Sequence, residues 1–191
     1  MGVWGDSGAM PAAVAAMHGD EPDIEARGVA AVQRGTGIIA RLVARIIGFP
    51  DSAVAVPLHV RLLRNGDSER WERRFAGQAF HSRLTRRDGL VTEHFGPLAF
   101  GFDLVAIPGG HAMQLRRWQC GPLRLPLLLA PRISASETEV RGRFAFDVCI
   151  DLPLFGLLIA YRGSLAPVPK AIDPATWSLS DEHASARRRR G

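Results

Sequence analysis

The sequence predicts an α+β fold that is mostly β: a curved antiparallel sheet or a calycin-like barrel of about nine or ten strands, with one or two short N-terminal helices. Three observations predict this class. From residue 51 onward, apolar residues alternate with polar ones, which is the period of a strand with one buried face. Turn-forming residue pairs recur at short intervals. Helical stretches do not alternate with the strands, as a parallel sheet would require.

Two segments near the N-terminus have a helical pattern. The segment at 11–20, PAAVAAMHGD, predicts a short helix, and a first strand follows at 23–35. Apolar residues at helical spacing predict a second helix over 38–47, packed on the sheet through its apolar stripe. That stripe consists of Ile38, Ile39, Leu42, Val43, Ile46 and Ile47, with Arg41 and Arg45 on the far side. The alternative is a helix that lies on a membrane surface.

The strands after residue 51 are identified by their inward rows and by the turns between them. The turns are NGD at 65–67, RDG at 87–89, PGG at 108–110 and RG at 141–142. The segment at 121–132, GPLRLPLLLAPR, is apolar but contains three prolines, so we expect it at a sheet edge or across an open barrel mouth. The predicted inward rows are Val56, Leu58, Val60 and Leu62; Trp71, Arg73 and Phe75; Phe80, Ser82 and Leu84; Leu98, Phe100, Phe102 and Leu104; Met113, Leu115 and Arg117; Phe144, Phe146, Val148 and Ile150; and Leu157, Ile159 and Tyr161.

These patterns predict one β-rich domain at 11–168, preceded by a flexible N-terminus at 1–10 and followed by a C-terminal extension at 169–191 with a basic, disordered tail. The net charge of +5 comes mostly from RRRR at 187–190, so the body of the domain is nearly neutral and nucleic-acid binding is not indicated. A helix-grip fold would need a long amphipathic helix within 169–186, and that pattern is missing.

Neither a signal peptide nor a transmembrane segment is visible in the sequence, and we therefore expect a cytoplasmic location. The two cysteines, Cys120 and Cys149, are expected to be reduced thiols.

Several segments together resemble a known bacterial family. They are MHG at 17–19, RGTGIIARLVARIIGFP, RRFAGQAF, EHFGPLAF, GPLRLPLLLAP and GRFAFDVCIDLPLFGLLIAYRGSL, and they occur in order over most of residues 16–166. The family is catalogued as domain of unknown function 4166. Leu152 and Ser164 differ from its pattern, which has His and Trp at these positions. The resemblance supports the fold and implies a nucleotide-binding oxidoreductase as a partner protein, because some members follow a saccharopine-dehydrogenase-like domain.

Motifs for common catalytic chemistry are missing from the sequence. It contains no phosphate-binding loop, no complete dinucleotide-binding glycine motif and no G-x-S-x-G nucleophile elbow. The six histidines are scattered without an i,i+4 pair, and no cysteine stands at metal-ligand spacing. We therefore expect no metal site and no cofactor, and whether the protein is an enzyme stays open.

The remaining candidates are polar residues in otherwise apolar inward rows. Arg73 lies between Trp71 and Phe75, and Glu93 lies between Val91 and Phe95, although the opposite register would turn His94 inward instead. Because burial of an unpaired charge costs several kcal/mol, Arg73 is either half of a buried pair, with Glu93 as the first candidate partner, or a polar anchor for a ligand.

Three functions are compatible with these candidates. The first is a β-barrel that binds a small apolar or acidic ligand, with ligand-binding residues Arg73, Trp71, Phe75, Glu93, His94, Arg117 and Tyr161. The second is an enzyme that performs proton transfer in the same cavity, with Glu93 or His94 as the base and Tyr161 as a hydrogen-bond donor. The third is a protein-interaction module that docks through the 38–47 helix or the 121–132 segment. A packed interior would favour the third function, and an enclosed cavity would favour the first two.

Overall fold

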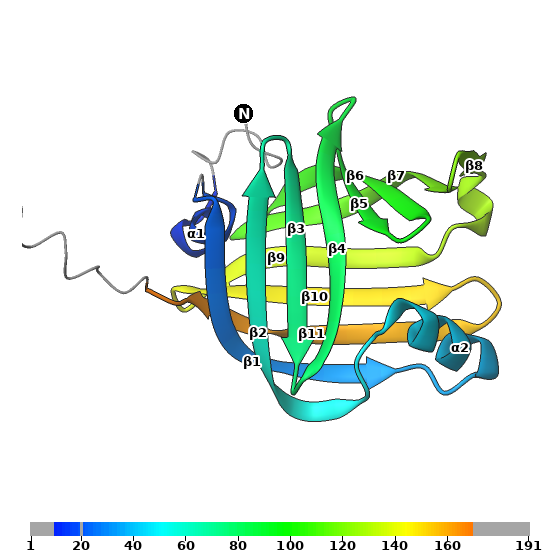
Figure 1. Ribbon diagram of the computed structural model, residues 1–191, viewed down its shortest axis with the longest axis horizontal. Coiled ribbons are helices and arrows are strands. Elements are labelled where there is room, and N and C mark those ends of the chain that lie inside the picture. Colours follow the sequence, from blue (N-terminus) through cyan, green and yellow to red (C-terminus); the bar gives the residue numbers. More distant parts are fainter. Residues whose placement is uncertain (1–9, 20, 170–191) are drawn as a thin grey trace, which may run out of the picture.

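Within residues 10–19 and 21–169, which the computed structural model describes, eleven antiparallel strands and two α-helices form a barrel (Figure 1). Ten strands make a ring in the order β6-β5-β4-β3-β2-β1-β11-β10-β9-β7, and the pairing of β6 with β7 closes it. Strand β8 pairs with β7 outside the ring. The prediction of a mostly β barrel with about nine or ten strands is therefore confirmed. The bounds are α1 Ala12–His18, β1 Asp23–Arg34, α2 Ile38–Ile47, β2 Ala53–Asn65, β3 Ser68–Phe75, β4 Gln78–Arg87, β5 Leu90–Phe95, β6 Leu98–Ile107, β7 Gly110–Cys120, β8 Leu123–Leu125, η2 Leu127–Leu129, β9 Arg132–Val140, β10 Arg143–Leu152 and β11 Gly156–Pro167.

The predicted terminal segments lie almost entirely outside the described residues. Of the segment at 1–10 the structure describes Met10, and of the extension at 169–191 it describes Pro169. The region that a helix-grip fold would need, 169–186, likewise lies outside them, apart from Pro169.

The predicted turns connect neighbouring strands of the ring. Asp88 and Gly89 both have positive φ angles, of 54° and 78°, as do Arg141 and Gly142, with 53° and 72°. Two successive residues of this kind match the twist of the strands on either side, which is why short hairpins prefer them.

The bend in the barrel wall depends on glycine. Strand β1 pairs with β2 on one side and β11 on the other, and it curves between these two groups of strands (Figure 1). A Cβ atom at Gly28 would lie 1.8 Å from the carbonyl oxygen of Ser164, and one at Gly163 would lie 2.3 Å from that of Val29. Only glycine lets the two backbones approach so closely.

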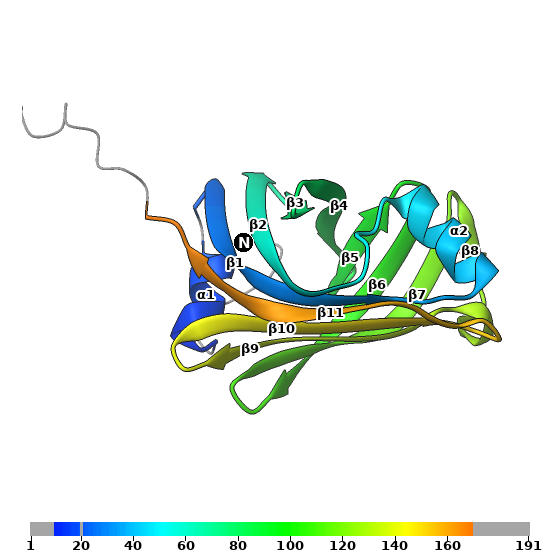
Figure 2. The same ribbon diagram turned by 90° about the horizontal axis from the view of Figure 1, so that it is seen from below.

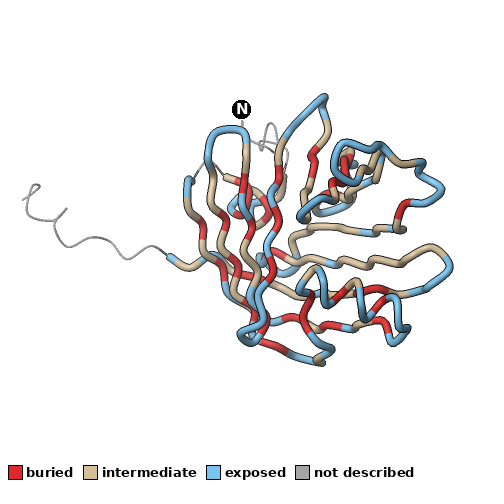
Figure 3. The backbone as a smooth tube through the Cα atoms, turned by 45° about the vertical axis from the view of Figure 1, so that its right-hand side comes forward, coloured by how far each residue is buried: buried red, intermediate tan, exposed pale blue. Residues whose placement is uncertain are grey.

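Most residues of the predicted inward rows face the barrel interior, but they are not equally buried. On β2, β3 and β4 the inward residues are almost fully buried, among them Leu62, Phe75 and Leu84. On β9 and β10 the wall is mostly half-buried, as the tan segments in Figure 3 show. This difference arises because the side chains of that wall face an interior space that other side chains do not fill.

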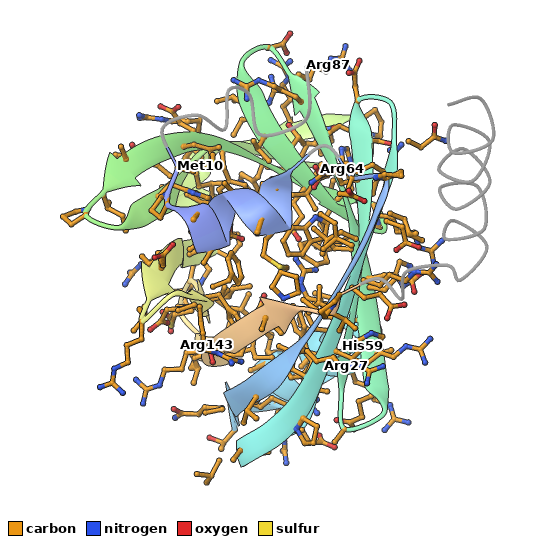
Figure 4. All side chains as sticks on the ribbon, turned by 90° about the vertical axis from the view of Figure 1, so that its left-hand side faces the viewer. Met10, Arg27, His59, Arg64, Arg87 and Arg143 are labelled. Atoms are coloured by element: carbon orange, nitrogen blue, oxygen red, sulfur yellow. The ribbon has the colours of Figure 1, made fainter. Side chains whose placement is uncertain are left out.

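Helix α1 covers one end of the barrel, which Figure 4 shows face-on. It contacts β9, β10 and β11, and its residues Val14 and Met17 are fully buried. The backbone N–H of Ala13 donates to Glu139 Oε2 at 2.8 Å, so a carboxylate of β9 binds the first turn of the helix.

Helix α2 lies at the opposite end, as both Figure 1 and Figure 2 show. The predicted bounds are confirmed, but the prediction that its whole apolar stripe packs on the sheet is wrong. The helix contacts β11 and β1 through Ala40 and Ala44, which are fully buried, and Val43 and Ile47 are half-buried. The rest of the stripe, Ile38, Ile39, Leu42 and Ile46, is exposed. The two alanines allow close contact with the strands, and these four larger residues face solvent instead.

The proline-rich segment matches both of its expected positions. Strand β8 is an edge strand that pairs only with β7, and Leu129 and Pro131 after it border the interior space. No helix within the described part of the chain is long and apolar enough to cross a membrane.

Candidate functional site

A cavity of about 270 Å³ lies inside the barrel. An engineered cavity of about 150 Å³ in a protein core suffices to hold benzene, so this one is large enough for a somewhat bigger molecule. Most of its wall is apolar. The apolar wall residues of β10 and β11 are Phe146, Val148, Ile150, Leu152 and Leu158, and those of β5, β6 and β7 are Phe95, Leu98, Phe100, Phe102, Met113 and Trp118.

The cavity reaches the surface at the end that carries α2. Val43 and Ile47 of that helix line it, together with Leu129 of η2. Leu129 is 57% exposed, so one wall residue belongs to the cavity and to the outer surface at once. At the α1 end, by contrast, Met17 and His18 are buried.

The Arg73 side chain points into the barrel and forms a buried network. Its Nη2 lies 3.2 Å from Glu93 Oε1, and its Nη1 donates to Ser82 Oγ at 2.9 Å. The Ser82 hydroxyl donates in turn to Glu93 Oε1 at 2.6 Å. The side chains of Arg73 and Glu93 are 13% and 14% exposed. The predicted pair of Arg73 with Glu93 is confirmed. Both side chains line the cavity, and their opposite charges neutralise each other there.

Aromatic rings surround this network. The guanidinium of Arg73 lies 4.8 Å from the centroid of the Trp71 ring and 5.3 Å from that of Phe80. Phe75 is 1% exposed and stacks on Phe80 at 5.8 Å. The face of an aromatic ring attracts a cation, so these rings stabilise the charged Arg73 side chain, as Glu93 also does. Trp71 and Arg73 line the cavity, whereas Phe75 packs behind it.

Tyr161 places a hydroxyl group in the cavity wall. It extends from β11, and its ring contacts the edges of Phe75 and Phe80. Among the described residues, its hydroxyl has no hydrogen-bond partner. Burial raises the pKa of Tyr161 to about 12; the nearby Arg73 lowers it, and the carboxylates of Glu93 and Glu137 raise it by smaller amounts. The hydroxyl is therefore protonated at neutral pH and can donate a hydrogen bond to a ligand.

His94 lies outside the barrel. Because Glu93 is the inward residue of β5, the next side chain points outward, and His94 Nε2 lies 3.3 Å from Thr85 Oγ1 on the outer face. Partial burial lowers the pKa of His94, as does the nearby Arg83. Of the two registers that the sequence left open, the structure therefore shows the one with Glu93 inside.

Arg117 also lies outside, although the alternation of β7 predicts an inward side chain. A β-bulge shifts the pairing of β6 with β7, so that Leu115 faces Phe102 but Arg117 faces Gly101, and Arg116 is the extra residue. One extra residue reverses the alternation beyond it. Trp118 consequently lines the cavity, and Arg117 pairs with Asp88 at 2.9 Å on the outer surface.

A second polar group, formed by His18, His111 and Glu137, lies at the α1 end of the barrel. The three residues come from α1, β7 and β9. Glu137 Oε2 lies 2.5 Å from His18 Nε2 and 3.2 Å from His111 Nε2. Their side chains are 0%, 6% and 12% exposed in the order His18, His111, Glu137. Burial alone would raise the pKa of Glu137, but the two histidines outweigh it and lower this pKa to about 2. Glu137 also lines the cavity.

This cluster was not predicted, because its members are far apart in the sequence. The signal that could have indicated the cluster was the face of the strand on which each residue lies, rather than the spacing of the residues in the sequence. His111 belongs to the inward row that continues with Met113, and Glu137 belongs to a row with Ile133 and Ala135. His18 stands at the end of the first helix, within the MHG segment. Only the closure of the barrel brings these three positions together.

The comparison with protein families identifies one family. A family model described as Domain of unknown function (DUF4166) matches residues 10–165. The chain belongs to this family. The matched region runs from α1 into β11, so it contains the cavity, the Arg73 network and the histidine cluster of this DUF4166 domain. No curated protein matches the sequence.

The first prediction for the DUF4166 domain concerns its buried ion pair. Replacement of Arg73→Leu leaves the carboxylate of Glu93 buried without its cation, so we expect the free energy of unfolding to fall by about 3 kcal/mol. The double variant with Glu93→Leu should recover much of this loss, because both charges are then removed. Chemical denaturation measures the free energy of unfolding of both variants. The control is Arg74→Leu, which replaces an exposed arginine of the same strand. Equal stabilities for the Arg73 and Arg74 variants would contradict the pairing.

The second prediction uses the single tyrosine of the chain. In an ultraviolet titration, Tyr161 of the native protein should ionise near pH 12, whereas the denatured chain should titrate near the ordinary value of about 10. Because folding raises this pKa, the stabilising contribution of the neutral phenol is complete below about pH 10 and is lost as the pH rises through about 12. A native midpoint near 10 would show that the hydroxyl is in contact with bulk water.

Proposed function

We propose that this protein binds a small, mainly apolar molecule inside the barrel. The observation that carries the proposal is the cavity of about 270 Å³, whose wall is formed largely by aromatic and aliphatic side chains. Ligand sites in proteins typically combine such a wall with a few polar groups that fix the orientation of the ligand. Tyr161 is such a group, and it faces the same space.

The charges in the wall favour a neutral ligand over an acidic one. A ligand anchor was one of the two roles predicted for Arg73, but its guanidinium is already paired with Glu93 and bound to Ser82. A ligand carboxylate would have to compete with Glu93 and would leave that side chain without its cation. A neutral molecule with one hydrogen-bond acceptor needs no such rearrangement, because Tyr161 can donate to it directly.

The alternative of an enzyme with a proton-transfer mechanism has less support. Glu93 Oε1 lies 3.2 Å from the Arg73 guanidinium and accepts a hydrogen bond from Ser82, so this carboxylate oxygen already has two protein partners. His94, the other candidate base, lies on the outer face. Within the part of the chain that the structure describes, the interior of the barrel thus supplies a donor in Tyr161 but no base without a bound partner beside it.

The proposal predicts that a neutral fluorescent probe binds inside the barrel. N-phenyl-1-naphthylamine should bind with increased fluorescence, and the variant Ala135→Phe, which adds a ring to the cavity wall, should weaken binding at least about tenfold by filling the space. The matched control is Ala106→Phe, which adds the same ring at an exposed position of β6. The anionic probe 1-anilinonaphthalene-8-sulfonate should bind more weakly than the neutral one. Equal binding of the neutral probe by both variants would contradict an interior site.

A further inference from the structure

We propose that His18, His111 and Glu137 form a binding site for a divalent transition metal, with Zn²⁺ as the reference ion. These three side chains supply two imidazole nitrogens and one carboxylate. Two histidines with one carboxylate are a ligand set that zinc sites use, and that non-haem iron sites use as well. The donor atoms of all three already lie within 4.8 Å of one another.

The distances fit a metal with little movement. Donors that are each about 2.0–2.2 Å from a tetrahedral zinc ion lie about 3.3 Å apart. The separation between His111 Nε2 and Glu137 Oε2 is 3.2 Å, close to that value. His18 Nε2 and Glu137 Oε2 are 2.5 Å apart and would have to separate slightly. A metal ion between them would replace the direct contact of the imidazole with the carboxylate.

The backbone holds two of the three donors in register. His111 and Glu137 are directly opposite each other on the paired strands β7 and β9, and both side chains point inward. The third donor, His18, is the last residue of α1, which is fixed by its buried residues Val14 and Met17. A site built on regular elements in this way is less mobile than one on loops.

The location of the site gives it a role in the proposed function. Glu137 lines the cavity, so a metal bound there would border the space that the apolar ligand occupies. A metal ion that borders the cavity in this way can also reach an acceptor atom of the ligand. The metal-binding proposal itself does not depend on the ligand and can be tested without one.

The test uses the full chain, treated with a chelator and then titrated with Zn²⁺ by isothermal titration calorimetry. We expect one ion per chain, and an affinity that falls at least about a hundredfold in His111→Ala and in Glu137→Gln. His81→Ala removes an exposed histidine of β4 and is the matched control, which should bind as the wild type does. Circular dichroism checks that each variant is folded.

A second measurement keeps the proposal falsifiable if the variants do not fold. Crystals of the wild type soaked in Zn²⁺ should show an anomalous scattering peak between His18, His111 and Glu137. Absence of stoichiometric binding by the wild type, or a zinc peak only elsewhere, would show that the three residues form a hydrogen-bonded ion pair and no metal site.

A second inference rests on the outer surface and is independent of the first. Large apolar side chains are exposed around the α2 end of the barrel, and we call them the apolar collar. Its residues are Ile38, Ile39, Leu42 and Ile46 of α2, Leu127, Leu128 and Leu129 of η2, and Leu154 and Phe155 of the turn between β10 and β11. Their exposed fractions reach 75% at Ile38, 88% at Leu128 and 99% at Leu154. Exposed apolar surface of this extent normally marks a place of contact.

We infer that the apolar collar docks onto an anionic lipid bilayer. The three segments lie together at one end of the molecule in both Figure 1 and Figure 2. Helix α2 has the character of a helix that lies in a membrane interface, since Arg41 and Arg45 flank its exposed apolar face. None of these segments contains an acidic residue. The collar therefore combines insertion of apolar side chains with attraction to negative headgroups.

Docking in this orientation would place the cavity next to the acyl chains, because Leu129 belongs to the collar and to the cavity wall. On this point the inference extends the proposed function, since an apolar ligand could then pass between bilayer and barrel without crossing water. The docking itself is tested without a ligand, so the two proposals can fail separately.

The test is sedimentation with lipid vesicles. The wild type should bind vesicles of phosphatidylcholine with phosphatidylglycerol, and binding should fall at least about tenfold with phosphatidylcholine alone or in high salt. The triple variant Ile38→Ser, Leu42→Ser and Ile46→Ser should lose binding. Val140→Ser, an exposed apolar residue at the far end of β9, is the control. If the wild type binds neither kind of vesicle, the inference is overturned. The collar would then serve self-association, which ultracentrifugation would show as a dimer, or contact with a partner protein such as an oxidoreductase.

Discussion

A ring of ten strands encloses more space than its own side chains fill, and the other features of this barrel depend on that constraint. Eight strands give an interior that side chains just fill or that holds one small ligand. Here the pairing of β6 with β7 closes a ring of ten, and most of the inward residues on β9 and β10 remain only half-buried. The cavity is thus a consequence of strand number. The chemical character of the cavity wall depends on which side chains the alternation of each strand turns inward.

Among residues 10–19 and 21–169, the charged groups that line the interior are paired. Arg73 and Glu93 neutralise each other near the middle of the wall, and Glu137 lies between two histidines at the α1 end. The α2 end, by contrast, has an apolar inner wall and carries the apolar collar on its outer side. The barrel therefore has a polar floor and an apolar entrance. This gradient favours a molecule that is mainly hydrocarbon with a polar group at its inner end.

Local patterns in the sequence were sufficient for the curved antiparallel sheet and for one candidate buried pair, but they left open whether the sheet closes into a ring. Alternation identified the inward faces, and the placement of Arg73 between Trp71 and Phe75, with Glu93 in the row of Val91 and Phe95, was enough to predict their contact. What the sequence could not show depends on events between distant elements. The bulge at Arg116 reverses the face of Arg117, and nothing in the local pattern indicates an extra residue. Helix α2 has a strong apolar stripe, yet contact with the strands is made by Ala40 and Ala44 beside it. The His18, His111 and Glu137 cluster exists only because β7 pairs with β9 and α1 covers that end.

The most direct test of the account is whether the interior is empty of protein and apolar. Xenon enters apolar cavities without needing a specific partner. Crystals of the protein under xenon pressure should show the gas inside the ring, in contact with Phe146, Val148 and Ile150, while the Arg73 and Glu93 pair stays intact. If the barrel interior held no xenon and these three side chains packed against the opposite strands, the cavity and the binding function built on it would be contradicted.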